Sequence, residues 1–271
     1  MAQRPGFPVK LNSQAKAAPV KAPAKAPLKA PLNGPLKAPA AKMPASSNPQ
    51  GLGLDSSAVR LRMVQKLAAQ GLKDPMVLQA MGSVERHRFV ESALVNQAYE
   101  DTSLPIGLGQ TISKPNVVAR MIELLREGAQ GKLGRVLEIG TGCGYQAAVL
   151  SHVATEVYSI ERHASLARSA TERLKRDGYT NVRVKHGDGT IGWSEYAPFD
   201  AIVVSAGGPR VPDALKAQLA VGGRLVMPVG EDVGLQRLVR VVRTAPDKWM
   251  TEELADVRFV PLIGVQGFRE P

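Results

Sequence analysis

Three glycines at alternate positions stand between an apolar run and a run predicted to be helical. The apolar run 136–139 is typical of a short buried strand, and Gly140, Gly142 and Gly144 follow it. Such a loop lets the backbone approach a ligand and leaves N–H groups free at the helix N-terminus, which predicts a nucleotide-like ligand. A dinucleotide loop needs its third glycine one position later, where Tyr145 stands, and the Gly-Lys-Ser/Thr of a Walker loop is absent.

The compact G-x-G-x-G spacing resembles motif I of the class I methyltransferases, which fold around an amino acid–nucleoside ligand without a pyrophosphate. The resemblance implies that S-adenosyl-L-methionine is the methyl donor. It assigns Gly140, Thr141, Gly142 and Gly144 to the site of this cofactor.

Three acidic residues accompany the loop. Glu161 ends the second predicted strand, where a carboxylate can accept both ribose hydroxyls; the alternative is an ordinary surface carboxylate. Asp188 and Gly189 end the third strand, where such a pair commonly faces the adenine, although Gly-Asp-Gly is also strong turn chemistry. Glu138 either orients the methionine amino group or braces the loop.

The sequence gives less support to a cysteine nucleophile or a metal site. Cys143 lies inside the glycine loop with no evident base partner, and we interpret it as a small filler. The four histidines are scattered, without a carboxylate or cysteine at ligand spacing, so we expect no metal.

The elements that must position these residues alternate between strand and helix. The predicted strands cover residues 136–139, 157–160, 182–184, 199–205 and 224–228, and the predicted helices cover 57–70, 75–81, 115–127, 145–153, 164–177 and 212–219. This order predicts an α/β fold with a doubly wound, Rossmann-like, mostly parallel sheet preceded by N-terminal helices. Residues 238–243 and 257–260 predict an antiparallel pair at the sheet edge. Residues 95–114 are predicted to be irregular.

The segment before the glycine loop carries information about the substrate. Residues 109–113 read G-x-T-I-S and are followed by Pro115, a pattern that closely resembles the protein-L-isoaspartate O-methyltransferases. Further matches to this family are residues 88–90, 136–146, 186–189, 198–202, 212–219, 222–230 and 259–262. The resemblance covers residues 57–265, with departures such as Glu85, where the family often has a proline.

The resemblance implies methyl transfer to the free α-carboxylate of L-isoaspartyl, and also D-aspartyl, residues in damaged proteins. This carboxylate is an anion at pH 7 and needs no general base, so the enzyme's work is positioning and desolvation. By analogy with the family, Ser113 hydrogen-bonds the acceptor carboxylate, and Thr111 and Ile112 belong to the cofactor site. The alternative role of Ser113 is to cap the helix that begins at Pro115. The ester would close to a succinimide, whose hydrolysis restores some normal aspartate.

Residues 1–54 differ in composition from the rest. They contain no Asp or Glu, ten of the 20 prolines and eight positive charges, which leaves +3 of the formal net charge of +11 for residues 55–271. Such a segment buries too little apolar surface to order itself, so we predict a disordered basic tail before one methyltransferase domain. The tail is interpreted as a solvated spacer, with weak, salt-sensitive polyanion contact as the alternative.

Several functions are disfavoured. No apolar run approaches the ~20 residues of a membrane span, and we expect a cytoplasmic monomer with no membrane contact. A tRNA base methyltransferase would carry an Asn-Pro-Pro-Tyr-type motif near residues 205–208, which read Ser-Ala-Gly-Gly. A nucleic-acid-binding protein that acts through its tail is the alternative outside the enzymes.

Overall fold

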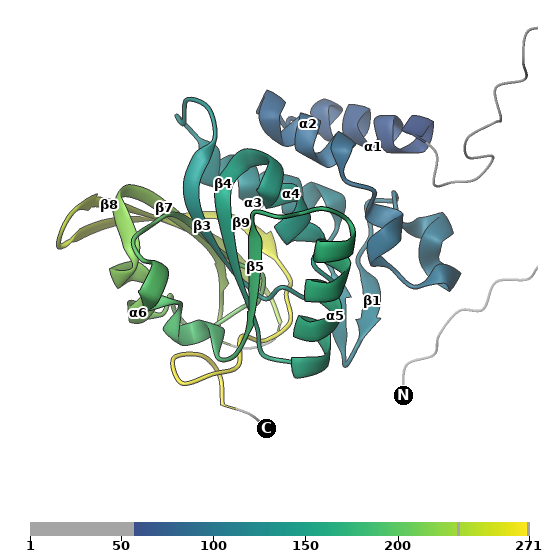
Figure 1. Cartoon of the computed structure of the whole chain (residues 1–271). Helices are drawn as coiled ribbons and strands as arrows, with labels where there is room; N and C mark the ends of the chain where they lie inside the picture. Colours follow the sequence, from purple (N-terminus) through teal and green to yellow (C-terminus); the bar gives the residue numbers. More distant parts are fainter. Residues whose placement is uncertain (1–56, 232–233, 270–271) are drawn as a thin grey trace, which may run out of the picture. The chain divides into compact units, whose positions relative to one another are not determined.

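The computed structural model describes residues 57–231 and 234–269 (Figure 1). The predicted tail 1–54 therefore lies outside the described residues. The helices are α1 Ser57–Ala69, α2 Pro75–Ser83, α3 Pro115–Arg126, α4 Tyr145–Val153, α5 Ala164–Arg176 and α6 Asp213–Ala217, with 3-10 helices η1 Arg86–Phe89, η2 Ser92–Gln97, η3 Gly189–Ile191 and η4 Ser194–Tyr196. The strands are β1 Leu104–Gly107, β2 Gln110–Ile112, β3 Leu133–Ile139, β4 Ala154–Glu161, β5 Val182–His186, β6 Phe199–Val204, β7 Leu219–Val229, β8 Gln236–Ala245 and β9 Lys248–Val257.

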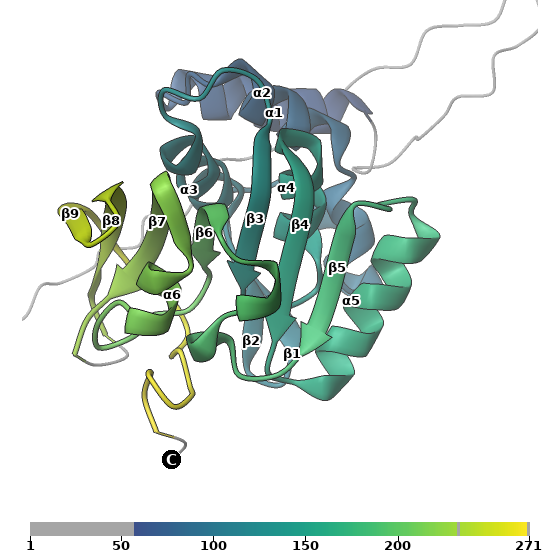
Figure 2. The same cartoon turned by 60° about the vertical axis from the view of Figure 1, so that its left-hand side comes forward.

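Seven strands form the main sheet in the order β5-β4-β3-β6-β7-β8-β9 (Figure 2). β3 pairs in parallel with β4 and β6, β4 with β5, and β6 with β7, whereas β7–β8 and β8–β9 are antiparallel. This confirms the predicted mostly parallel sheet with an antiparallel edge. The chain winds from β3 out to β5 and then returns to β6 on the other side of β3. The strand order reverses between β3 and β6, and a ligand site is expected beyond their carboxyl ends.

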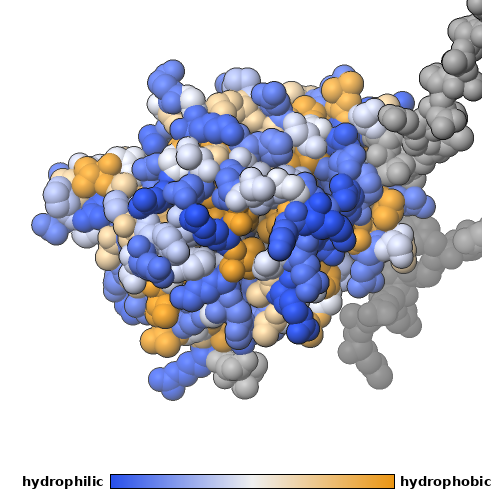
Figure 3. All heavy atoms as spheres, in the orientation of Figure 1, coloured by the Kyte–Doolittle hydropathy of each residue, from blue (hydrophilic) through white to orange (hydrophobic). Residues whose placement is uncertain are grey.

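The central strands are buried on both faces, as near-continuous apolar runs require. Val136 and Val203 pack into a core shared with α1 to α4, whereas Leu137 and Ile202 pack into a second core that includes Leu215 of α6. Figure 2 shows α4 and α5 behind the sheet and α6 in front of it. On the face seen in Figure 3, hydrophobic residues form small areas among hydrophilic ones.

The helices α1 to α5 confirm the five helices predicted between residues 57 and 177. α2 begins at Pro75 and is capped by Asp74, whose Oδ1 accepts the N–H groups of Met76 and Val77 at 2.9 and 3.2 Å. α3 likewise begins at a proline, Pro115. Among the described residues, no helix has both the length and the apolar character that a membrane span requires.

The prediction that residues 95–114 are irregular was wrong. They contain an antiparallel hairpin in which Leu104 of β1 pairs with Ile112 of β2, and both side chains are buried. The glycines that suggested a loop form its turn, where Gly107, Leu108 and Gly109 all have positive φ. The hairpin ends directly before Ser113.

Two further predictions needed correction. The outermost strand is β9, not residues 257–260, because an edge strand exposed along most of its length carries polar residues and lacks an apolar signal. The apolar run 259–262 instead crosses the carboxyl ends of the sheet. The predicted helix 212–219 is shorter, because Leu219 already begins β7.

Candidate active site

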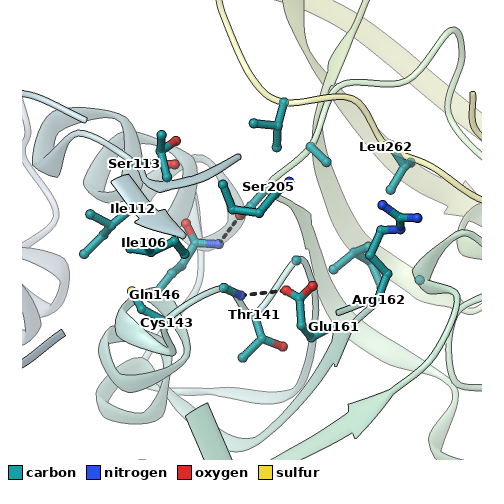
Figure 4. A pocket seen from close by; sticks show the side chains of 18 of the residues that line it. Ile106, Ile112, Ser113, Thr141, Cys143, Gln146, Glu161, Arg162, Ser205 and Leu262 are labelled. Atoms are coloured by element: carbon teal, nitrogen blue, oxygen red, sulfur yellow. Dashed lines mark hydrogen bonds between the residues drawn. The ribbon is translucent and has the colours of Figure 1, made fainter. Parts of the chain in front are cut away.

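A pocket opens beyond the carboxyl ends of β3, β4 and β6, where the strand order reverses. Its walls come from the β1–β2 hairpin up to Ser113, the glycine loop with the start of α4, the residues that follow β4 and β6, and residues 260–263. Figure 4 shows Ser113, Gln146, Glu161 and Ser205 around this space. Open α/β sheets bind their ligands in this crevice.

The first two glycines of the loop leave the pocket wall without side chains at their positions. Gly140 and Gly142 have φ of +93° and +53°, a region that favours glycine. A Cβ on Gly142 would lie 3.1 Å from Ile106 Cδ1, and one on Gly140 would lie 3.5 Å from Ser205 Cβ. Both glycines and Thr141 between them line the pocket, so backbone groups face the ligand there.

Two other predicted glycines are explained by packing. A Cβ on Gly144 would lie 3.3 Å from Leu174 of α5, so this glycine lets the two helices approach, and it does not line the pocket. Gly189 does line the pocket, and a Cβ there would overlap the side chain of Ile139 at the end of β3.

Glu161, at the end of β4, lines the pocket and fixes the glycine loop. Its Oε2 accepts the N–H of Gly142 at 2.8 Å, and its Oε1 accepts the N–H of His163 at 2.9 Å (Figure 4). Only 5% of the residue is exposed. The carboxylate is thus held in one orientation on the pocket wall, with acceptor capacity left on both oxygens.

Glu138 lies behind the wall. It is fully buried, does not line the pocket, and accepts a 2.5 Å hydrogen bond from Ser159 Oγ, which itself lies 2.5 Å from Thr141 Oγ1. Burial raises the pKa of Glu138 to about 8. Its Oε1 has no hydrogen-bond partner among the described residues. Of its two expected roles, this geometry favours bracing the loop, through Ser159 and Thr141.

Asp188 is also outside the pocket lining. Its Oδ1 accepts hydrogen bonds from the N–H and hydroxyl of Thr190, and its Oδ2 accepts the N–H of Val265 at 2.9 Å. The carboxylate therefore ties the C-terminal segment to the end of β5. The role of Asp188 toward an adenine stays a prediction.

Ser113 faces the pocket from the other side, together with Thr111 and Ile112. The N-cap of α3 is Lys114, not Ser113, and the first-turn N–H of Asn116 donates to Asp101 Oδ1 at 2.9 Å. The hydroxyl of Ser113 makes no hydrogen bond to any residue in the described part of the chain, so it is available to a ligand.

Arg86, which was not among the predicted site residues, holds the Ser113 backbone. Its side chain is fully buried, donating through Nε to Ala98 O at 2.7 Å and through Nη2 to Ser113 O at 2.8 Å. The guanidinium lies over the ring of Tyr145, 4.7 Å from its centroid. Burial lowers the pKa of Arg86. The only sequence signal was its place two residues before the matched run 88–90.

The rest of the wall also comes from residues that were not selected. Gln146 Nε2 donates to Ser205 Oγ at 2.8 Å and so joins α4 to the end of β6 (Figure 4). Val260, Pro261 and Leu262 close the pocket from the C-terminal segment. Gln146 and residues 259–262 lay inside matched runs, which was the available signal.

Metal and thiol chemistry have no geometric support. The described residues hold no group of three or more His, Cys, Asp or Glu side chains that could bind a metal ion. Cys143 is buried, and burial raises the pKa of its thiol, which disfavours the nucleophilic thiolate. The burial of Cys143 and the raised pKa of its thiol both agree with its interpretation as a filler.

Residues 59–267 match the family model of protein-L-isoaspartate(D-aspartate) O-methyltransferase. A protein-L-isoaspartate O-methyltransferase of Methylobacillus flagellatus is 50% identical over 221 residues, which cover 81% of this chain and 98% of that protein. One of Burkholderia mallei is 57% identical over 211 residues, covering 78% of this chain and 65% of its own length, so the chain spans just under two thirds of that relative.

Solved structures agree with these matches. A protein-L-isoaspartate O-methyltransferase structure superposes with a TM-score of 0.70 at 29% identity, covering 77% of this chain and 67% of that one. A Plasmodium falciparum structure of the same enzyme name, which contains S-adenosyl-L-homocysteine, gives a TM-score of 0.63 at 26% identity, covering 75% of this chain and 98% of that one.

Proposed function

Because the chain belongs to the protein-L-isoaspartate(D-aspartate) O-methyltransferase family, we propose that it repairs damaged proteins by carboxyl methylation. It transfers the methyl group of S-adenosyl-L-methionine to the free α-carboxylate of L-isoaspartyl, and also D-aspartyl, residues. The adjacent amide nitrogen of the chain then attacks the ester carbonyl and methanol leaves, which forms a succinimide, and hydrolysis of this ring returns part of the material to normal aspartate.

One observation carries this proposal: the glycine loop and the hydroxyl of Ser113, which makes no hydrogen bond within the described residues, line the same pocket. The bare backbone at Gly140 and Gly142 and the fixed carboxylate of Glu161 fit an amino acid–nucleoside ligand. We assign Glu161 to the ribose hydroxyls, and Thr111, Ile112, Thr141 and Gly189, which also line the pocket, to the other contacts of the cofactor. Glu138, Gly144 and Asp188 support these contacts from outside the lining.

The residues present suit a reaction that needs no general base. When bound, S-adenosyl-L-methionine supplies an electrophilic sulfonium methyl group, and the acceptor carboxylate is already ionised at pH 7. Ser113 donates its hydroxyl hydrogen to one acceptor oxygen and so orients the other. Ile112 and Leu262 provide apolar walls that exclude water from the reacting groups.

The test is methyl transfer from labelled S-adenosyl-L-methionine to two synthetic peptides, identical except for L-isoaspartate or L-aspartate at one position. We expect base-labile label in the isoaspartyl peptide only. Label in neither peptide, with cofactor binding intact, would overturn the substrate assignment. Label in RNA instead would favour a base methyltransferase.

We also propose the oligomeric state, the location and the role of the basic segment, each from the sequence. The enzyme acts as a monomer, it acts in the cytoplasm, and the eight positive charges of residues 1–54 make only weak, salt-sensitive contacts with polyanions. Light scattering coupled to size-exclusion chromatography tests the first point, and a mass near twice the 28.9 kDa of the chain would contradict it.

A further inference from the structure

A second groove adjoins the pocket at Ser113. It has a volume of about 650 Å³ and is bounded by residues 103–117 on one side and by residues 256–261 on the other. Thr111, Ser113 and Ser205 line both spaces. A chain lying in the groove would therefore reach the Ser113 hydroxyl without contacting the glycine loop, which lines only the first pocket.

Two cations line this groove without a partner of their own. Lys114 directly follows Ser113, and Arg258 follows β9; both side chains are exposed. Neither makes a hydrogen bond or an ion pair with any residue of 57–231 or 234–269. Asp256 also lines the groove, but its carboxylate is 3.0 Å from Arg237 and is thus already paired.

The groove therefore presents uncompensated positive charge on both of its sides. Exposed charges at the rim of a binding site attract groups of opposite sign over about one Debye length and act mainly on encounter and affinity. Residues 1–54 of this chain cannot be the matching ligand, because they contain no Asp or Glu.

We propose that this groove binds the residues flanking the isoaspartyl linkage and that Lys114 and Arg258 select substrates with acidic side chains there. The inference rests on the proposed function, since it takes the isoaspartyl carboxylate to lie at Ser113. Isoaspartyl sites within acidic stretches would thus be the preferred repair substrates.

The experiment uses the full chain and three peptides with one central L-isoaspartate, flanked on both sides by Glu, Gln or Lys. At low salt we expect kcat/KM to be about 5-fold higher for the Glu peptide than for the Gln peptide, mainly through KM, and lowest for the Lys peptide. The preference should fall as NaCl is raised from about 50 to 500 mM.

The variant K114Q/R258Q should abolish most of the Glu-over-Gln ratio. The matched control is R168Q/K175Q, which removes one arginine and one lysine that are exposed on α5, away from the groove, and should keep the ratio. The ratio is compared within each variant, so a general change in activity does not imitate the effect.

Other results would overturn the inference in distinguishable ways. Equal kcat/KM for the three peptides, or a ratio unchanged in K114Q/R258Q, would refute charge selection while the proposed function stands. Absence of methylation in all three peptides would refute the proposed function as well. Equal kcat/KM together with competition by an RNA oligonucleotide that is lost in K114Q/R258Q would assign the groove to nucleic acid.

Discussion

The two walls of the pocket are built differently. The donor wall, Gly140–Gly142 with Glu161 and Gly189, comes mainly from one β3–α4–β4 unit and is held by backbone N–H groups on a carboxylate. The acceptor wall, Ser113 with Gln146, Ser205 and residues 260–263, brings together segments from distant parts of the sequence, and a side-chain hydrogen bond from Gln146 to Ser205 joins two of them. A local motif therefore fixes the donor wall, whereas the tertiary fold assembles the acceptor wall.

The largest effect is expected on the donor wall. Glu161→Ala removes the acceptor of the Gly142 and His163 N–H groups, and hydrogen bonds to charged groups contribute about 1.5–3 kcal/mol each. The Kd for S-adenosyl-L-methionine should rise roughly 100-fold or more, measured by isothermal titration calorimetry. Glu161→Gln, which keeps the shape and one acceptor oxygen, should lose less affinity for the cofactor. Unchanged cofactor binding in the alanine variant would show that the loop holds without this carboxylate.

A change in the acceptor wall should alter peptide methylation and leave cofactor binding nearly unchanged. Ser113→Ala removes the hydroxyl proposed to orient the acceptor carboxylate, so kcat/KM for an isoaspartyl peptide should fall about 10- to 100-fold. The Kd for the cofactor should stay within about 2-fold, because the donor wall is untouched. Ser113→Thr retains a hydroxyl and serves as the control. Equal losses in cofactor and peptide binding would erase the distinction between the two walls.

Arg86 tests whether the acceptor wall depends on support from outside. Arg86→Met leaves the buried carbonyl of Ala98 and the partly buried carbonyl of Ser113 without their donor, which should cost about 2–4 kcal/mol in the free energy of unfolding. At a temperature where the variant is folded, peptide kcat/KM should fall about 10-fold, with a smaller change in cofactor Kd. Arg86→Lys, which keeps the charge and part of the donor capacity, should recover some activity. Wild-type peptide kinetics in folded Arg86→Met would exclude a positioning role.

The same contrast explains what the sequence could predict. The glycine loop, Glu161 and the parallel strands were predictable because the periods of strand and helix, and the glycine spacing, are local signals. Eight of the eleven predicted site residues line the pocket, while Glu138, Gly144 and Asp188 stand behind it.

The missed features depend on long-range placement. No local pattern marks Arg86 as a donor to Ser113, because the two are 27 residues apart and meet only through the fold. β9 lacks an apolar face because it is the sheet edge, so residues 257–260, which begin at its last residue, were predicted as the strand. Of these residues, Val260 lines the pocket, together with Pro261 and Leu262 that follow it.

Glu138, which supports the donor wall, should make the stability of the protein depend on pH. Its pKa in the folded state, about 8, is above the roughly 4.3 of an exposed glutamate, so between these values the folded protein binds more protons than the unfolded chain. Its contribution to stability is therefore full below about pH 4.3 and is lost as pH rises through about 8. Glu138→Gln should remove this loss and be more stable than wild type above pH 8, by the order of a few kcal/mol. Thermal unfolding of both proteins from pH 5 to 9 measures the difference, and parallel curves would contradict a buried, protonated Glu138.

The smallest effect is expected from residues 1–54. Both walls are built from residues between 106 and 263, so deletion of residues 1–54 should change neither the cofactor Kd nor peptide kcat/KM by more than about 2-fold at moderate salt. The comparison uses the full chain and the truncated chain with the same short isoaspartyl peptide. A loss confined to the peptide parameters would assign these residues to the acceptor wall, because a basic segment that contacted the donor wall would alter cofactor binding too. A loss of both would make them part of the folded enzyme.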